Sequence, residues 1–182
     1  MNSFISNNCY SGVNPVMSSK ELAQDYYQKA MAVGDPERGL SEAQFQEIYS
    51  YLDQAIALDP TYPGFYIARA SIVGFTSVKR MERKEADPDR RTGIDLVSQA
   101  IAINPDFTDE HFPIGMAQLI RGSLLLLNIV DAFTHGTKPS RKEFDLAKAD
   151  FEFAEQHGIP KAGEMLNTLD RFEAIINNQF AE

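Results

Sequence analysis

The sequence has few of the residues on which disulfides, metal sites and most catalytic centres depend. Its 182 residues include one cysteine, Cys9, and three histidines. A single cysteine excludes an intramolecular disulfide, and no residues have the C-x-x-C or H-E-x-x-H spacing of a zinc site. No G-x-G-x-x-G motif follows a strand pattern and no G-x-x-x-x-G-K motif is present, so no loop is predicted to hold nucleotide phosphates. We therefore expect a protein that is not an enzyme and that has no cofactor and no metal.

Basic charge is also scarce. The chain has 17 Lys and Arg against 26 Asp and Glu, which gives a net charge of −9 at pH 7. A nucleic-acid binder needs a basic face that releases counterions from phosphates, so nucleic acid is not an expected partner. Hydrophobic residues make up 43% of the chain. At about 150 residues per domain, this length and composition predict one domain with its own core.

The sequence has no recognisable export signal and no long apolar run. Residues 1–18 are polar and uncharged, without the apolar stretch of a signal peptide, and we expect them to form a disordered lead-in. A single helical domain is expected over residues 19–182. The main apolar run, Leu124–Val130, is bracketed by Arg121 and Asp131 and is shorter than the about 20 residues of a membrane span. The expected location is the cytoplasm, without direct membrane insertion.

What the sequence does contain is helical periodicity. It predicts an all-α fold of about seven antiparallel helices, at about 19–33, 41–58, 63–79, 89–103, 109–135, 141–157 and 161–179. Gly34, Gly136 and Gly158 mark helix ends, and His135 and His157 fall in last turns, where a cation favours the negative end of the helix dipole. A serine followed three residues later by Glu or Gln predicts three capping boxes, at Ser18 with Glu21, Ser41 with Gln44 and Ser140 with Glu143.

Two segments of the chain resemble each other. Residues 53–70 (DQAIALDPTYPGFYIARA) and 98–115 (SQAIAINPDFTDEHFPIG) share a Q-A-I-A core, an aliphatic residue, Asp or Asn, and then Pro. Small and large apolar residues precede a proline in three places: Leu52, Ala55 and Pro60; Val97, Ala100 and Pro105; and Ala147, Phe151, Ala154 and Pro160. This pattern resembles the tetratricopeptide repeat (TPR), and the chain is similar to a divergent member of that family with about three repeats. The resemblance implies an α-α superhelix in which Ala70 and Gly115 are the small residues where two helices cross.

The resemblance also implies a concave groove lined by the first helix of each repeat. The groove residues would be Ile67, Ser71 and Phe75 on one helix and Phe112, Met116 and Ile120 on another, each set spaced by four. This stripe is apolar and has no Lys or Arg, unlike the family members that hold a terminal carboxylate in the groove. It therefore favours a hydrophobic or helical peptide as ligand. The residues leave open whether the groove is free or covered by the chain's own helices.

The expected function is that of a protein-interaction scaffold, either an adaptor or a chaperone. Two alternatives are a self-assembling structural subunit, which would be a homo-oligomer, and a helical accessory subunit of a membrane transport or secretion system. The predicted helix 109–135 bears on this choice, because at about 40 Å it is longer than a repeat helix and its second half needs a cover. The favoured cover is the last helix, through Met165, Leu166, Leu169, Phe172, Ile175 and Ile176.

Overall fold

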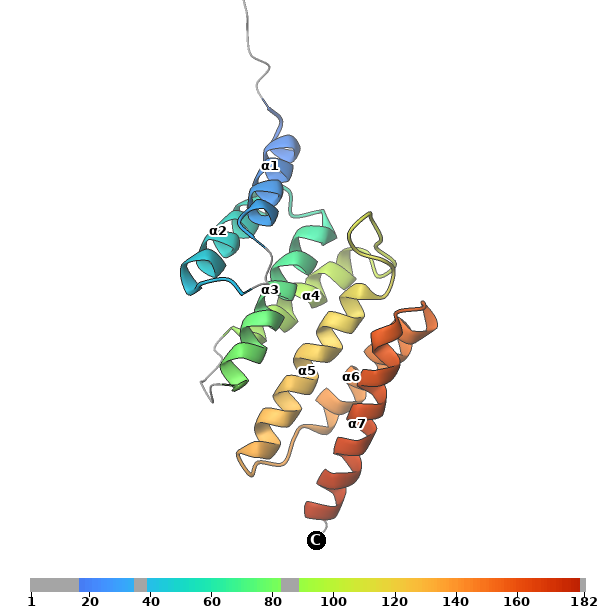
Figure 1. Ribbon diagram of the computed structural model, residues 1–182. Coiled ribbons are helices and arrows are strands. Elements are labelled where there is room, and N and C mark those ends of the chain that lie inside the picture. Colours follow the sequence, from blue (N-terminus) through green and yellow to red (C-terminus); the bar gives the residue numbers. More distant parts are fainter. Residues whose placement is uncertain (1–16, 35–38, 83–88, 181–182) are drawn as a thin grey trace, which may run out of the picture.

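The computed structural model describes residues 17–34, 39–82 and 89–180. These residues form seven α-helices and no strand, as the sequence predicts. The helices are α1 (Ser19–Ala32), α2 (Glu42–Leu58), α3 (Pro63–Glu82), α4 (Arg90–Ile103), α5 (Met116–Thr134), α6 (Arg141–Gln156) and α7 (Pro160–Gln179), shown in Figure 1. Of the predicted lead-in, residues 1–16 lie outside the described residues. Residues 83–88, in the connection between α3 and α4, also lie outside the described residues.

The helices pair in chain order. α1 packs on α2, α3 on α4 and α5 on α6, while α7 packs on α6 and α5. The first helices of the second and third hairpins, α3 and α5, also contact each other, whereas the second helices α2, α4 and α6 have no comparable contact with one another within the described residues. A stack whose first helices lie closer together than its second helices curves toward the first-helix layer. α3, α5 and α7 therefore line the concave side, nearer the viewer in Figure 1.

Helix starts follow the predicted capping chemistry in part. Both interactions of the capping box are present at α1 and α2, through Ser18 with Glu21 and Ser41 with Gln44. The prediction for α6 is wrong, because the Ser140 side chain makes no capping hydrogen bond. Glu143 instead accepts a hydrogen bond from Nδ2 of Asn128, at 3.3 Å, and so connects α6 to α5.

The repeat positions are buried as the TPR resemblance implies. In the second helix of each hairpin they are at most 1% exposed: Leu52, Ala55, Val97, Ala100, Ala147, Phe151 and Ala154. Glycine allows the closest approaches. A Cβ on Gly122 of α5 would lie 2.7 Å from a ring carbon of Phe151, and one on Gly93 of α4 would lie 2.8 Å from Cγ1 of Val73. Small residues therefore fix how closely the two helices of these hairpins approach.

The predicted helix 109–135 is wrong at its beginning, because α5 begins at Met116. Oδ1 of Asp109 accepts the backbone N–H groups of His111 and Phe112, both at 2.8 Å, and this turn competes with the helix. Gly115 then has φ 88°, a left-handed conformation that glycine adopts without strain. α5 is about 28 Å long, shorter than the about 40 Å expected for helix 109–135.

The second half of α5 is nevertheless covered by α7, as predicted. The Phe133 and Phe172 rings meet edge to face at 6.0 Å, and Leu169 and Ile176 are buried in the same core. Ile175 is the exception among the predicted covering residues, since it is 49% exposed. His135 and His157 lie at helix ends as predicted, as the C-cap residues of α5 and α6. Nδ1 of His135 and of His157 each lies 2.8 Å from a carbonyl oxygen of the preceding turn.

The register of the repeat also needs correction. Gly115 is not the counterpart of Ala70; the segment Arg69-Ala70-Ser71 of α3 recurs about two helical turns later than predicted, as Arg121-Gly122-Ser123 of α5. Both arginines reach the residue after the buried Leu52 or Val97 of the preceding hairpin, namely Asp53 and Ser98. Both serines donate to the carbonyl oxygen four residues earlier. These shared contacts set the true alignment of α3 with α5.

Candidate functional site

The three predicted groove residues of α3 differ in how far they are accessible. Ile67 is 1% exposed and lies in a core cluster with Val97 and Ala117. Ser71 is half-buried, and its hydroxyl donates to the carbonyl of Ile67. Phe75 is 38% exposed. The groove is therefore covered at the beginning of α3 and open toward its end.

The three predicted residues of the next repeat do not form a helical stripe. Phe112 precedes α5, in the connection from α4, whereas Met116 and Ile120 lie on α5 itself. All three are half-buried, and Phe112 and Ile120 pack against the cluster that contains Ile67. With the corrected register, the residues of α5 that correspond to Ile67, Ser71 and Phe75 are Leu119, Ser123 and Leu127.

Residues 104–115, which we call the strap, pack through Phe107 and Phe112 against the cluster that contains Ile67. The ring of Phe107 meets the Tyr62 ring edge to face at 5.3 Å, and the Tyr62 hydroxyl donates to Oδ2 of Asp109. Further along the strap, His111 lies 6.0 Å from the ring of Tyr27 on α1. The strap therefore lies beside the connection that leads into α3 and reaches α1 of the first hairpin.

Burial and charge near the strap act on two tyrosines. Desolvation, with smaller contributions from the charges of Asp109 and Glu110, raises the pKa of Tyr27 to about 12. Desolvation and the hydrogen bond to Asp109 raise the pKa of Tyr62 as well. Both phenols therefore stay protonated at neutral pH, and Tyr62 remains a donor to the strap.

Beyond the strap, the concave side has an accessible set of residues that we call the concave strip. On α3 it consists of Ser71, Gly74, Phe75 and Val78, spaced so that they share one helical face. Ser123 and Leu127 continue it on α5, at the positions equivalent to Ser71 and Phe75. Val78 is 45% exposed, and a Cβ on Gly74 would meet no atom within 4 Å. The strip therefore combines apolar side chains with open space above a glycine.

Beneath this layer, a buried ion pair connects three helices. Nε and Nη2 of Arg121 donate to the two carboxylate oxygens of Asp150 on α6, at 2.8 and 2.7 Å. Nη1 of Arg121 lies 3.5 Å from Oγ of Ser98 on α4. Desolvation raises the pKa of Asp150, and Arg121 opposes this shift. The pair is satisfied within the chain, and its arrangement holds α5 against both neighbours.

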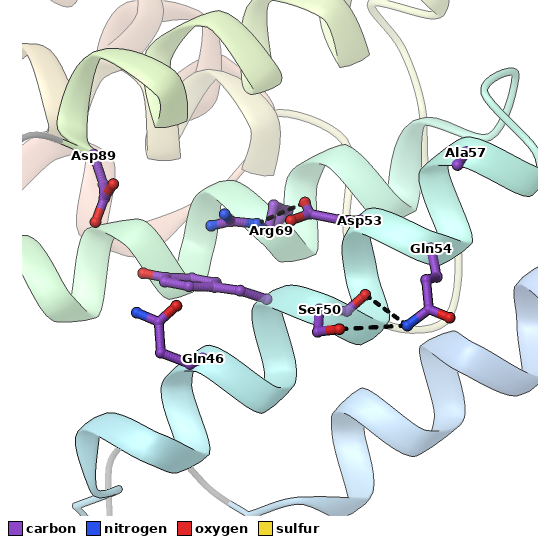
Figure 2. A pocket seen from close by; sticks show the side chains of 8 residues that line it. Gln46, Ser50, Asp53, Gln54, Ala57, Arg69 and Asp89 are labelled. Atoms are coloured by element: carbon purple, nitrogen blue, oxygen red, sulfur yellow. Dashed lines mark hydrogen bonds and ion pairs between the residues drawn. The ribbon is translucent and has the colours of Figure 1, made fainter.

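Arg69 of α3 is the residue equivalent to Arg121. It borders a recess of about 600 Å³ between α2 and α3, where the first two hairpins meet. The Arg69 guanidinium stacks over the Tyr49 ring at 3.6 Å, and its Nε donates to Asp53 at 3.0 Å. Figure 2 shows the Arg69–Asp53 interaction together with that of Ser50 and Gln54. Nη1 of Arg69 is buried without a hydrogen-bond partner among the described residues. Both side chains that hold Arg69 come from α2, so the recess forms part of the seam between the first two hairpins.

Two properties of the described residues concern metals and membranes. No group of three or more His, Cys, Asp or Glu in the described part of the chain is placed to hold a metal ion. Among the same residues α5 alone is long and apolar enough to cross a membrane, judged by length and composition. Its buried residues, including Leu124, Leu125 and Ile129, belong to the core shared with α3, α6 and α7.

The fold is similar to that of the TPR domain of Arabidopsis OM64. The two structures match with a TM-score of 0.57 and 15% sequence identity, over 85% of this chain and 98% of that one. No protein-family profile matches the sequence, and a search of the curated proteins finds no match. The structural likeness establishes the fold as a TPR-like helical solenoid.

Proposed function

We propose that this protein is a non-enzymatic adaptor that binds a hydrophobic or helical segment of another protein on its concave face. The observation that carries the proposal is the concave strip, where Phe75 and Val78 remain exposed on an inner helix that is otherwise well packed. A partner that buries these side chains gains free energy from removing apolar surface from water. A chaperone that holds exposed apolar segments is one form of this function, and the proposed location is the cytoplasm.

The proposed binding residues therefore differ from those predicted from the sequence. Phe75 is kept, and Val78 and Leu127 are added. Ile67 and Phe112 leave the accessible site because one is buried and the other packs in the strap. Phe112→Ala is therefore a poor test, since it removes a ring from a core cluster as well as from any interface.

The test compares exposed apolar side chains on the two opposite layers of the stack. Phe75→Glu with Val78→Glu alters the concave strip, and Ile103→Glu alters an equally exposed residue at the end of α4, in the second-helix layer. The three purified proteins are used for affinity capture from native extract, followed by mass spectrometry. Circular dichroism and melting curves check that the variants fold like the unmodified protein.

We expect the unmodified protein and the Ile103→Glu variant to retain the same partner, and the strip variant to lose most of it. Equal retention by all three proteins would contradict the proposal. Sedimentation of the purified protein tests the structural-subunit alternative. A stable homodimer that dissociates on Phe75→Glu would assign the strip to self-assembly.

A further inference from the structure

The strap is longer than a turn between hairpins needs to be. The equivalent connection between α2 and α3 is the short segment 59–62, whereas α4 and α5 are joined by residues 104–115. The additional residues reach Tyr62, just before α3, and Tyr27 of α1. The insertion therefore lies at the beginning of α3, where the groove starts, beside α5 in Figure 1.

The strap is held there by few groups. Phe107 and Phe112 are half-buried and supply the apolar contacts, and Asp109 accepts the hydrogen bond from Tyr62. Thr108, Glu110 and His111 are exposed. Two aromatic side chains with one carboxylate between them therefore make the main side-chain contacts, beside the ring contact of His111 with Tyr27 and the hydrogen bond from Gln118 to the Pro105 carbonyl.

The strap also has its own local structure. Oδ1 of Asp109 holds the backbone N–H groups of His111 and Phe112, while Oδ2 is the atom that meets Tyr62. One carboxylate thus folds the turn and attaches it to the connection that leads into α3. A separate peptide with the same residues can make both interactions, because neither requires the covalent connection to α4 or α5.

We propose that the strap is an internal ligand, and that the partner carries an extended segment with an acidic residue between two aromatic ones that takes its place. This inference rests on the proposed function and names the chemistry of the partner. Displacement of the strap exposes Tyr62, which precedes α3, and one side of the cluster that contains Ile67, on the same helix as Ser71 and Phe75. The covered and open parts then form one continuous groove along α3.

The test uses a fluorescein-labelled peptide with the sequence of residues 104–115 and measures its binding by fluorescence anisotropy. The protein is compared with a released-strap variant that carries Phe107→Ser and Asp109→Ser. A matched control carries Thr108→Ser and Glu110→Gln, which change exposed strap residues. We expect the released-strap variant to bind the peptide at least about tenfold more tightly than the unmodified protein and the control. A peptide with Asn at the position of Asp109 should bind about tenfold more weakly.

Equal peptide affinity for a folded released-strap variant and the unmodified protein would overturn the inference, as would the absence of binding to either. A dimer formed by exchange of straps would also overturn it, since the occupant would then be a second copy. If the released-strap variant does not fold, hydrogen exchange of the unmodified protein decides. The amides of His111 and Phe112 are expected to exchange by local opening, faster than those of α3 and α5, and exchange only with global unfolding would contradict the proposal. If the peptide experiment fails but the variant with Phe75→Glu and Val78→Glu still loses its partner, the proposed function stands without this inference.

Discussion

The buried pair of Arg121 and Asp150 provides a sharp test of how the stack is held together. Asp150 is 3% exposed, and the Arg121 side chain is 16% exposed. Asp150→Leu removes the acceptor of two short hydrogen bonds and leaves Nε and Nη2 of Arg121 without it. Removing one partner of a buried ion pair costs about 3–5 kcal/mol of unfolding free energy. That is a large part of the about 5–15 kcal/mol that a domain typically has.

The double variant Arg121→Met with Asp150→Leu should behave differently. Both charges are then replaced by apolar side chains of similar size, so no buried charge is left unpaired. Such replacements are often neutral or stabilising, and we expect the double variant to unfold within about 2 kcal/mol of the unmodified protein. The exposed pair of Lys148 and Asp170, at 41% and 51% exposure, is the control. Asp170→Ala should cost no more than about 1 kcal/mol.

Urea unfolding followed by the helical circular dichroism signal measures these differences. The predicted order of stability places Asp150→Leu far below the double variant, although it carries fewer substitutions. A cost below about 1 kcal/mol for Asp150→Leu would refute the reasoning. A double variant whose loss of stability equals the sum of the losses for Asp150→Leu alone and Arg121→Met alone would also refute it, because the two residues would then be uncoupled.

Two further predictions concern packing and alkaline pH. Gly122→Ala should lower the unfolding free energy by about 1–3 kcal/mol because the added Cβ meets the Phe151 ring. Gly74→Ala should raise it by about 0.5–1 kcal/mol because the added Cβ meets no atom. Thermal melts that reverse this order of stability would contradict the packing. The raised pKa of Tyr27 means that the folded state favours the neutral phenol, so its contribution to stability is complete below pH about 10 and is lost as the pH rises to about 12. In unfolding curves at pH 9 to 12, Tyr27→Phe should reduce this loss of stability. An unchanged dependence of stability on pH in the variant would contradict the prediction.

The helices were largely predictable from the sequence because their signals are local. The spacing of apolar residues, the capping serines and the glycines at helix ends each depend on residues within one or two helical turns. The beginning of α5 was missed because apolar periodicity was extended through a segment with turn signals of its own. Asp109, Pro113 and Gly115 lie in that segment, and together they indicate a turn rather than a helix.

The candidate site was less predictable because it depends on the path of one insertion. The similarity between residues 53–70 and 98–115 suggested a constant repeat length, which placed Gly115 opposite Ala70. The recurrence of Arg69-Ala70-Ser71 in α5 would have shown the additional residues between the hairpins. Nothing local indicates that Asp109 meets Tyr62, so the packing of the strap against the cluster that contains Ile67 is visible only in the folded chain.

Photo-crosslinking tests the concave strip as a partner surface most directly. A benzoyl-phenylalanine placed at position 75 reports contact at the strip, and the same residue at position 103, an equally exposed site in the second-helix layer, reports non-specific contact. After irradiation in cells, we predict an adduct with another polypeptide from position 75 and none from position 103. No adduct from position 75, or equal adducts from both positions, would contradict the proposal that this face binds a partner.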